Sequence, residues 1–330
     1  MMMKELIAKF PTQIIEALEI GEKAEIHGHA RPITKVFVAG LGGSGIGGDF
    51  VWAFIKDECK IPVLVGKSYH LPAFVDENTL YIASSYSGNT EEVLHSIGEV
   101  QKTGAKIVVI TSGGKLLQLA QEKGYDYVAL PPNYPSPRAC LGFSIVAQLY
   151  VFYKLNLISR SSIDQVKSSV DLLKYDQDEI KNKAFKIAKL IAGKTPIIYV
   201  SDRMEAVALR FKQQINENAK TLSWYNVIPE MNHNELVGWS EMHVNAAVIY
   251  FRNKDDFKRN ALRIDISKDI IAKQTHTVIE IFSKGQSPVE KSMYFIHLGD
   301  WISLYLAELK PVDPSEIKVI DFLKTELGKI

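Results

Sequence analysis

The stretch ITKVFVAGLGGSGIGGDFVWAFI, residues 33–55, decides how the fold is read. Its first seven residues are mostly β-branched, aromatic or otherwise apolar, and they predict a buried strand. The glycine-rich run at 39–49 follows, and the apolar segment FVWAFI continues at 50–55 as a helix. A strand, a glycine loop and a helix in that order are typical of a parallel α/β sheet.

Similar apolar runs recur along the chain at intervals that leave room for helices. In the first half they are IPVLVG from residue 61, TLYIAS from 79, KIVVIT from 106 and YDYVAL from 125. In the second half they are TPIIYVS from 195, TLSWYNV from 221, HVNAAVIYF from 243, HTVIEIF from 276 and MYFIHL from 293. We therefore expect an α/β protein with two doubly wound parallel-sheet, flavodoxin-like domains, the second a structural repeat of the first.

The expected boundary between the two halves follows a change in composition. The loop PPNYPSPRAC at 131–140 leads into an apolar helix at 141–155, and a polar, lysine-rich stretch at 159–183 then shows weak helical periodicity. A chain of 330 residues exceeds the size of a single ordinary core. We expect an amino-terminal domain over residues 1–155 and a carboxy-terminal domain over residues 156–330.

Bulk composition narrows the class of protein. Lys plus Arg number 39 and Asp plus Glu number 38, so the charge gives no reason to expect nucleic acid or an acidic membrane surface as a partner. Two cysteines, Cys59 and Cys140, predict neither a disulfide framework nor a cysteine zinc site. The first residues lack the pattern of a signal peptide, and no apolar run reaches the roughly 18 residues of a membrane helix. These features predict a cytoplasmic protein.

The glycine loop has two interpretations. Gly40, Gly42 and Gly45 fit the dinucleotide pattern G-x-G-x-x-G, which also requires an acidic residue after the second strand to bind the ribose. That strand ends instead in GKS, residues 66–68, which weakens the NAD interpretation. Lys67 could still accept a 2′-phosphate, so an NADP-linked oxidoreductase stays open as an alternative.

Both strand-terminal loops favour a phosphate monoester. Glycine amides and a helix N-terminus bind anions, and the loop SSYSGNTEE at 84–92 crowds hydroxyl groups at the end of the predicted strand TLYIAS. The Walker pattern of nucleotide triphosphate sites is absent from the sequence. The expected phosphate-binding residues are Gly42, Gly43, Ser44, Ser85, Ser87 and Thr90. Tight packing of the glycines, a solvated serine loop and helix capping by Asn89 or Thr90 are the alternatives.

Four motifs occur in order across both halves: GLGGSGIGGD, SSYSGNTEE, NENAK at 216–220 and PEMNHNELVGW at 229–239. They resemble the motifs of the bifunctional phosphoglucose/phosphomannose isomerase family, which belongs to the sugar-isomerase-domain (SIS) superfamily. The resemblance implies two SIS-type domains and an enzyme that needs no cofactor and no metal. It implies interconversion of glucose 6-phosphate, and of mannose 6-phosphate, with fructose 6-phosphate through a cis-enediol(ate).

The resemblance also implies site residues. Arg203, Arg210 and Glu217 share one face of a predicted helix, and from spacing alone that face is a solvated, salt-bridged surface. The family's motif makes Glu217 the base that carries the proton between C1 and C2. It implies that His233 assists ring opening and is supplied by the partner subunit of an obligate homodimer. It places Arg138 near the enediolate.

Two carboxy-terminal positions are less closely tied to the motifs. Lys310 is expected to contact the substrate, and Ser303 is a candidate for the residue that sets tolerance at C2. From the residues alone, His233 could equally be a hydrogen-bonded surface histidine and Arg138 a salt-bridged loop arginine.

Two other classes of function remain as alternatives. One is a phosphosugar-binding SIS protein without catalysis, although no helix-turn-helix or basic surface is evident. The other is a metal-dependent phosphomannose isomerase, with His233, Glu235, Glu241 and His243 as ligands. Their spacing matches no H-E-x-x-H helix, which argues against a metal site.

Overall fold

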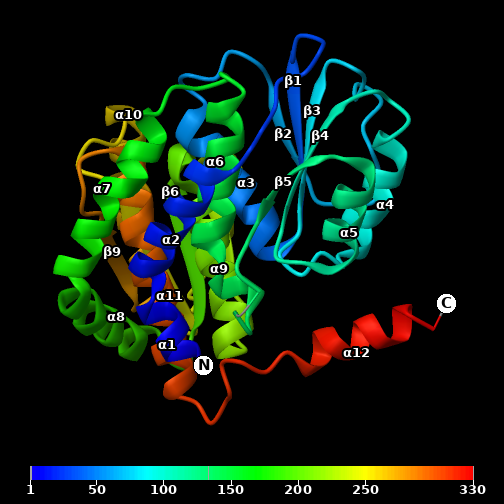
Figure 1. Cartoon of the computed structure of the whole chain (residues 1–330). Coiled ribbons are helices and arrows are strands. Elements are labelled where there is room, and N and C mark those ends of the chain that lie inside the picture. Colours follow the sequence, from blue (N-terminus) through cyan, green and yellow to red (C-terminus); the bar gives the residue numbers. More distant parts are fainter. Residues whose placement is uncertain (1, 133, 330) are drawn as a thin grey trace. The chain divides into compact units, whose positions relative to one another are not determined.

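The computed structural model describes residues 2–132 and 134–329. The chain divides into two compact units, each with a parallel sheet of its own (Figure 1). Among the described residues, the first unit comprises Ala8–Lys174 and Gly285–Met293, and the second comprises the rest. None of the described helices is long and apolar enough to cross a membrane.

The first unit contains a five-stranded sheet. Its strands are β1 (Lys35–Ala39), β2 (Val63–Gly66), β3 (Thr79–Ser84), β4 (Lys106–Thr111) and β5 (Asp126–Ala129). All pairs are parallel, in the order β2-β1-β3-β4-β5, which is the flavodoxin-like order. In this order β1 and β3 are neighbours, so the loops that follow them meet at the carboxyl edge of the sheet.

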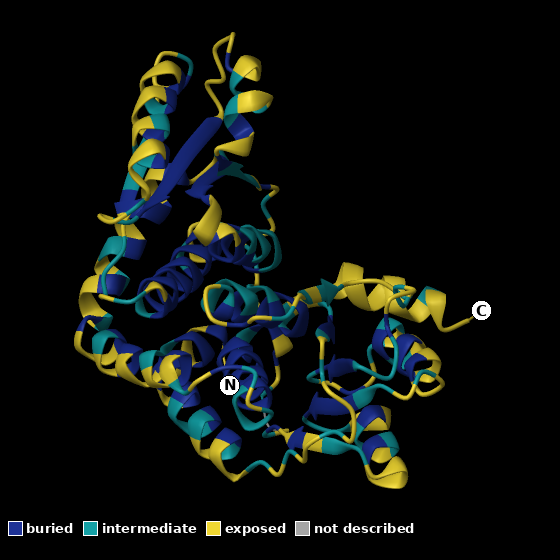
Figure 2. Ribbon diagram, turned by 90° about the horizontal axis from the view of Figure 1, so that it is seen from above, coloured by how far each residue is buried: buried dark blue, intermediate teal, exposed yellow. Residues whose placement is uncertain are grey.

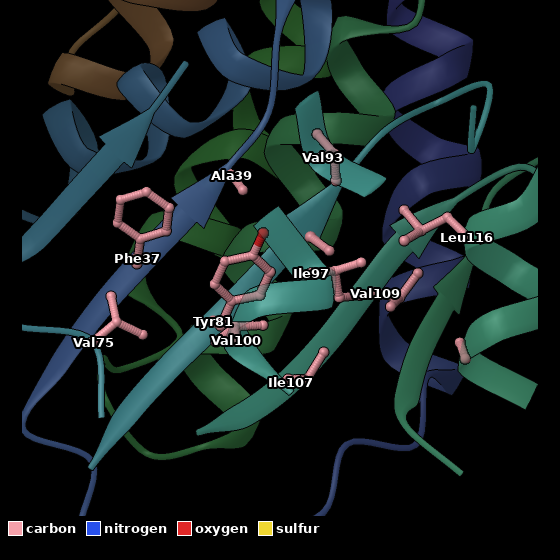
Figure 3. Close-up of a cluster of buried hydrophobic side chains, with 12 residues drawn as sticks. Phe37, Ala39, Val75, Tyr81, Val93, Ile97, Val100, Ile107, Val109 and Leu116 are labelled. Carbon is pink, nitrogen blue, oxygen red and sulfur yellow. The ribbon is translucent and has the colours of Figure 1, made fainter. Parts of the chain in front are cut away.

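Helices cover both faces of this sheet. On one face, α4 (Glu91–Val100) and α5 (Gly114–Lys123) pack on Phe37, Tyr81 and Val109, which form the core drawn in Figure 3. On the other face, α3 (Gly42–Ile55) packs closely on the sheet: a Cβ at Gly48 would lie 3.2 Å from the side chains of Val38 and Val65. The first unit also holds α2 (Phe10–Lys23), the short η1 (Pro137–Ala139), α6 (Leu141–Lys154) and α7 (Ser161–Tyr175).

The second unit contains a four-stranded parallel sheet. Its strands are β6 (Thr195–Ser201), β7 (Trp224–Ile228), β8 (Ala246–Arg252) and β9 (Val278–Phe282), in the order β7-β6-β8-β9. Figure 2 shows that the central strands are buried. The predicted fold class, two doubly wound parallel sheets, is confirmed.

Alternation of side chains along β8 separates the two faces of the second sheet. Tyr250 belongs to a core with Met231, Trp239 and Ile264, which come from η3 (Glu230–His233), the residue after η4 (Glu235–Gly238), and α10 (Lys258–Ile271). The next residue, Phe251, contacts Phe211 and Phe295 from α9 (Glu205–Ala219) and α11 (Pro288–Glu308). Helices α9 and α11 therefore cover one face, and η3, η4 and α10 cover the other.

One predicted strand is wrong. The run MYFIHL at 293–298 lies inside α11 and all six residues are buried. A short apolar run that is buried on every side looks the same in a strand and in a core helix, so its pattern could not decide between them. The polar stretch expected to bridge the halves forms α7 and α8 (Gln177–Ile191). The remaining helices are α1 (Met3–Ala8), η2 (Asp202–Met204) and α12 (Lys318–Leu327).

Candidate active site

The glycine loop of the first unit lies against the segment that carries Arg138. Gly42 opens α3 with a φ of 51°, a left-handed conformation that favours glycine. A Cβ at Gly43 would lie 3.1 Å from the carbonyl oxygen of Pro137 and 3.7 Å from the Cα of Arg138. Arg138 itself is 6% exposed. The start of α3, whose first amide groups have no partner within the helix, thus lies against the backbone of Pro137 and Arg138.

The serine loop joins the glycine loop directly. The amide of Tyr86 donates to the Ser44 hydroxyl at 3.3 Å. The Ser85 and Thr90 hydroxyl oxygens are 2.7 Å apart, and the amide of Gly88 donates to Ser85 Oγ at 3.1 Å. Thr90 occupies the N-cap position of α4, but its side chain makes no capping hydrogen bond. Its hydroxyl is held inside the loop, which argues against the capping alternative.

Tyr86 extends this connection to the proline-rich loop. Its hydroxyl donates to the carbonyl of Pro131 at 2.5 Å and accepts from the amide of Tyr134 at 3.3 Å. One side chain therefore links the serine loop to the chain that leads to Arg138. Nothing in the motif distinguishes an inward tyrosine from an exposed one, so this role of Tyr86 could not be predicted.

Lys67 forms an ion pair with Asp49. Its Nζ lies 2.5 Å from the Asp49 carboxylate on α3. Burial raises the pKa of Asp49, although the hydrogen bond from Lys67 opposes that shift. A lysine paired in this way is poorly placed to bind a 2′-phosphate, which weakens the NADP alternative further.

In the second unit, Glu217 lies in the last turn of α9 and is half-buried. The helix ends at Lys220, which has a φ of 50°. The ammonium of Lys220 donates to the carbonyls of Glu217 and Glu316, at 2.6 and 2.8 Å. These two hydrogen bonds fix the backbone at the end of α9, where Glu217 lies.

The predicted solvated face of α9 is wrong at Arg210, which is 2% exposed. Its Nη2 donates to both oxygens of Asp300 on α11, at 3.1 and 3.2 Å. Gln214 donates to the same carboxylate at 2.8 Å. Charges spaced along one helix do not reveal that another helix covers them, so this buried contact could not be predicted.

Lys310 and Ser303 both lie near the end of α9. Lys310 follows α11, and its ammonium donates to the carbonyl of Ala219 at 3.4 Å and to the Thr221 hydroxyl. Ser303 is fully buried; its hydroxyl accepts from Asn218 at 2.9 Å and donates to the Asp300 carbonyl at 2.8 Å. Lys310 is thus beside the turn that carries Glu217, whereas Ser303 lies within the contact between α9 and α11.

His233 is exposed at the end of η3. Its neighbours are anchored: Asn232 donates to Ser267 Oγ at 2.7 Å, and Asn234 donates to Glu230 at 2.7 Å. Met231 of η3 and Phe211 of α9 pack on opposite faces of the second sheet, so the elements that carry His233 and Glu217 cover different faces.

Two side chains of the metal alternative have other partners. Glu235 accepts from Tyr199 and Asn226, and the His243 ring lies 3.2 Å from the Gly238 carbonyl oxygen. Within residues 2–132 and 134–329, no group of three or more His, Cys, Asp or Glu side chains is arranged to hold a metal ion. Glu235 is instead bound to strands β6 and β7 through Tyr199 and Asn226.

The chain is similar to proteins of known family. The family model for the SIS domain matches residues 31–152, and the model for the bacterial phospho-glucose isomerase C-terminal SIS domain matches residues 180–327. A bifunctional phosphoglucose/phosphomannose isomerase from Caldicellulosiruptor bescii is 43% identical over 339 residues, covering 99% of each chain. A D-glucosamine-6-phosphate 4-epimerase from Sulfolobus acidocaldarius is 35% identical over 214 residues, covering 64% of this chain and 66% of that protein.

At low sequence identity, a match to a solved structure shows only that the two proteins share a fold. The C-terminal domain of glucosamine-fructose-6-phosphate aminotransferase from Francisella tularensis superposes with a TM-score of 0.74 at 15% identity. The match covers 95% of this chain and 98% of that chain.

Proposed function

The chain belongs to the bifunctional phosphoglucose/phosphomannose isomerase family, and we propose on that basis that it is an aldose-ketose isomerase. It interconverts glucose 6-phosphate, and mannose 6-phosphate, with fructose 6-phosphate. The observation that carries the proposal is the 43% identity to a bifunctional isomerase along 99% of both chains.

Removal of the C2 proton from either aldose gives the same cis-enediol(ate), so one base serves both epimers. Glu217 is that base, carrying the proton between C2 and C1. Arg138 stabilises the negative charge of the enediolate, and Lys310 is a further polar contact to the sugar. No cofactor is needed, because the hydrogen moves within the substrate.

The 6-phosphate binds at the carboxyl edge of the first sheet. Its proposed ligands are the amides of Gly42 and Gly43 and the hydroxyls of Ser44, Ser85, Ser87 and Thr90. The hydrogen bond from Tyr86 to Ser44 supports this site, because it holds the two loops side by side.

Ring opening is assigned to His233 of a second copy in a homodimer. The elements that carry His233 and Glu217 cover opposite faces of one sheet, which supports a site shared between two copies of the chain. The expected location is the cytoplasm, where the phosphosugars of glycolysis and gluconeogenesis are converted.

A coupled assay with each aldose, in the presence of a chelator, tests this function. We expect turnover of both sugars, and its loss in Glu217→Gln but not in the control Glu205→Gln at the other end of α9. Inactivation by the chelator would overturn the metal-free mechanism. Turnover of glucosamine 6-phosphate alone would instead favour a 4-epimerase, the activity that names one relative.

A further inference from the structure

The segment that carries His233 is held to the second sheet by a group of buried and partly buried hydrogen bonds. The Tyr199 hydroxyl donates to Glu235 Oε1 at 2.5 Å and accepts from Trp239 Nε1 at 2.9 Å. Asn226 donates to the second carboxylate oxygen of Glu235 at 2.7 Å. Two strands thus bind the chain immediately after His233. We call Tyr199, Asn226, Glu235 and Trp239 the clamp.

The clamp adds directional bonds to the apolar packing of Met231 and Trp239 in this segment. Glu235, Gly238 and Trp239 line a cavity of about 490 Å³ that reaches the amino ends of β6 and β8. A chain that borders a cavity has fewer packed side chains on that side, so directional bonds help to fix its position. Burial and the Glu235 carboxylate raise the pKa of Tyr199, which keeps its hydroxyl protonated and able to donate.

Tyr250 provides an internal comparison. It is the register partner of Tyr199 on β8, and the two ring centroids are 5.4 Å apart. Both side chains are fully buried. The Tyr250 hydroxyl, however, has no hydrogen-bond partner anywhere in residues 2–132 and 134–329. Two tyrosines in the same row of one sheet therefore differ in whether the hydroxyl holds the His233 segment.

We propose that Tyr199 is a positioning residue for His233: through Glu235 and Trp239 it fixes the exposed imidazole at the place where it meets the sugar ring. This inference rests on the proposed role of His233 in ring opening. It assigns the reaction a residue on β6 that does not touch the substrate.

Matched variants test it in the full-length enzyme. Tyr199→Phe should lower kcat about ten- to a hundredfold, as misplacement of a catalytic group by about 1 Å does. KM should change little, because the phosphate loops belong to the first unit. Tyr250→Phe, the same chemical change one strand away, should leave kcat and KM unchanged. Equal activity of the two variants would overturn the proposal.

A double-mutant cycle separates positioning from general damage. In a His233→Ala background, Tyr199→Phe should cause no further loss of kcat, whereas in the wild type it does. An undiminished loss in that background would show that Tyr199 acts elsewhere. Full activity of His233→Ala itself would refute the role of His233 and this inference with it. If His233→Ala is inactive but Tyr199→Phe keeps wild-type activity, the inference about Tyr199 is refuted and the role of His233 stands.

Variants of Glu235 keep the test decisive if Tyr199→Phe does not fold. Glu235→Gln retains an acceptor for the Tyr199 hydroxyl and should keep most of the activity. Glu235→Ala removes both bonds to the sheet and should lose activity as Tyr199→Phe is expected to. No difference between these two variants would contradict the clamp.

Discussion

His297 is completely buried in α11, where its Nε2 accepts a hydrogen bond from Trp301 Nε1 at 3.2 Å. Burial, reinforced by the charge of Lys181, lowers the pKa of His297 to about 3. Below its ordinary pKa of about 6.5, the unfolded chain therefore binds a proton that the folded chain does not. The folded state is favoured fully above pH 6.5, and this advantage is lost as the pH falls towards 3.

The free energy of unfolding should consequently fall between pH 7 and pH 5, by about 1.4 kcal/mol for each pH unit well below 6.5. His297→Gln keeps an acceptor for Trp301 but does not titrate, so the slope should become shallower. Urea unfolding at several pH values measures it. His276→Gln, at an exposed position, is the control and should leave the slope unchanged. An unaltered slope in His297→Gln would contradict the assignment.

Ser44 should act on binding rather than on the chemical step. Ser44→Ala removes a hydroxyl from the proposed phosphate site and the acceptor for the Tyr86 amide. We expect KM to rise about tenfold, corresponding to roughly 1.5 kcal/mol for the lost bonds, with a smaller effect on kcat. The inhibition constant for inorganic phosphate should rise in parallel. A fall in kcat at constant KM would place Ser44 at the reacting carbons instead.

The proximity of the glycine and serine loops was predictable at the residue level, whereas the burial of the α9 charges was not. Ser44 and Ser85 each follow a buried strand, and parallel strands bring such positions to one edge of the sheet. The partner of Arg210 is Asp300, which is 90 residues away on a helix whose packing no local pattern specifies. The Tyr199 clamp depends likewise on strand register, which the hydrophobic pattern leaves open.

At the scale of elements, α9 and α11 are joined by a buried polar contact. Arg210 and Gln214 donate to Asp300, and Asn218 donates to Ser303. Glu217 precedes Asn218, so this contact also sets the orientation of the proposed base. The strands were predicted well because each is a short run of apolar residues. The buried segment of α11 contains a run of the same kind, so it was predicted as a strand.

Asp300→Ala should destabilise the protein strongly. It leaves the Arg210 guanidinium buried without this carboxylate, a change that typically costs about 3–5 kcal/mol. Asp300→Asn keeps an acceptor and should cost less. Asp178→Ala is the control: Asp178 pairs with Lys181 on an exposed turn of α8, and its loss should not measurably change the unfolding midpoint. Equal midpoints for Asp300→Ala and the control would show that the pair contributes nothing.

At the scale of the whole molecule, both family matches and both sheets support a duplicated α/β architecture. The matched ranges 31–152 and 180–327 lie on either side of residue 155, and the predicted domain boundary there stays a prediction. The sequence could not place His233 relative to Glu217, since their separation depends on which helices cover each face of the second sheet.

That separation leads to a test of the shared site. Glu217→Gln and His233→Ala enzymes should each be nearly inactive alone. If His233 acts on the partner's substrate, a heterodimer of the two contains one site with both defects and one site with neither. Co-expression with two different affinity tags, followed by purification on both, isolates this heterodimer. It should recover about half of the wild-type activity, since one of the two symmetric sites is intact.

If both residues served a site within one chain, each subunit of the heterodimer would carry one defect and no activity would return. A heterodimer of Glu217→Gln with a Glu217→Gln, His233→Ala double variant is the matched control, because it lacks an intact base in either arrangement. Recovery in that control would reveal contaminating isomerase. The arrangement of η3 and α9 on opposite faces of one sheet therefore makes the oligomer, rather than the single chain, the unit in which the chemistry is expected.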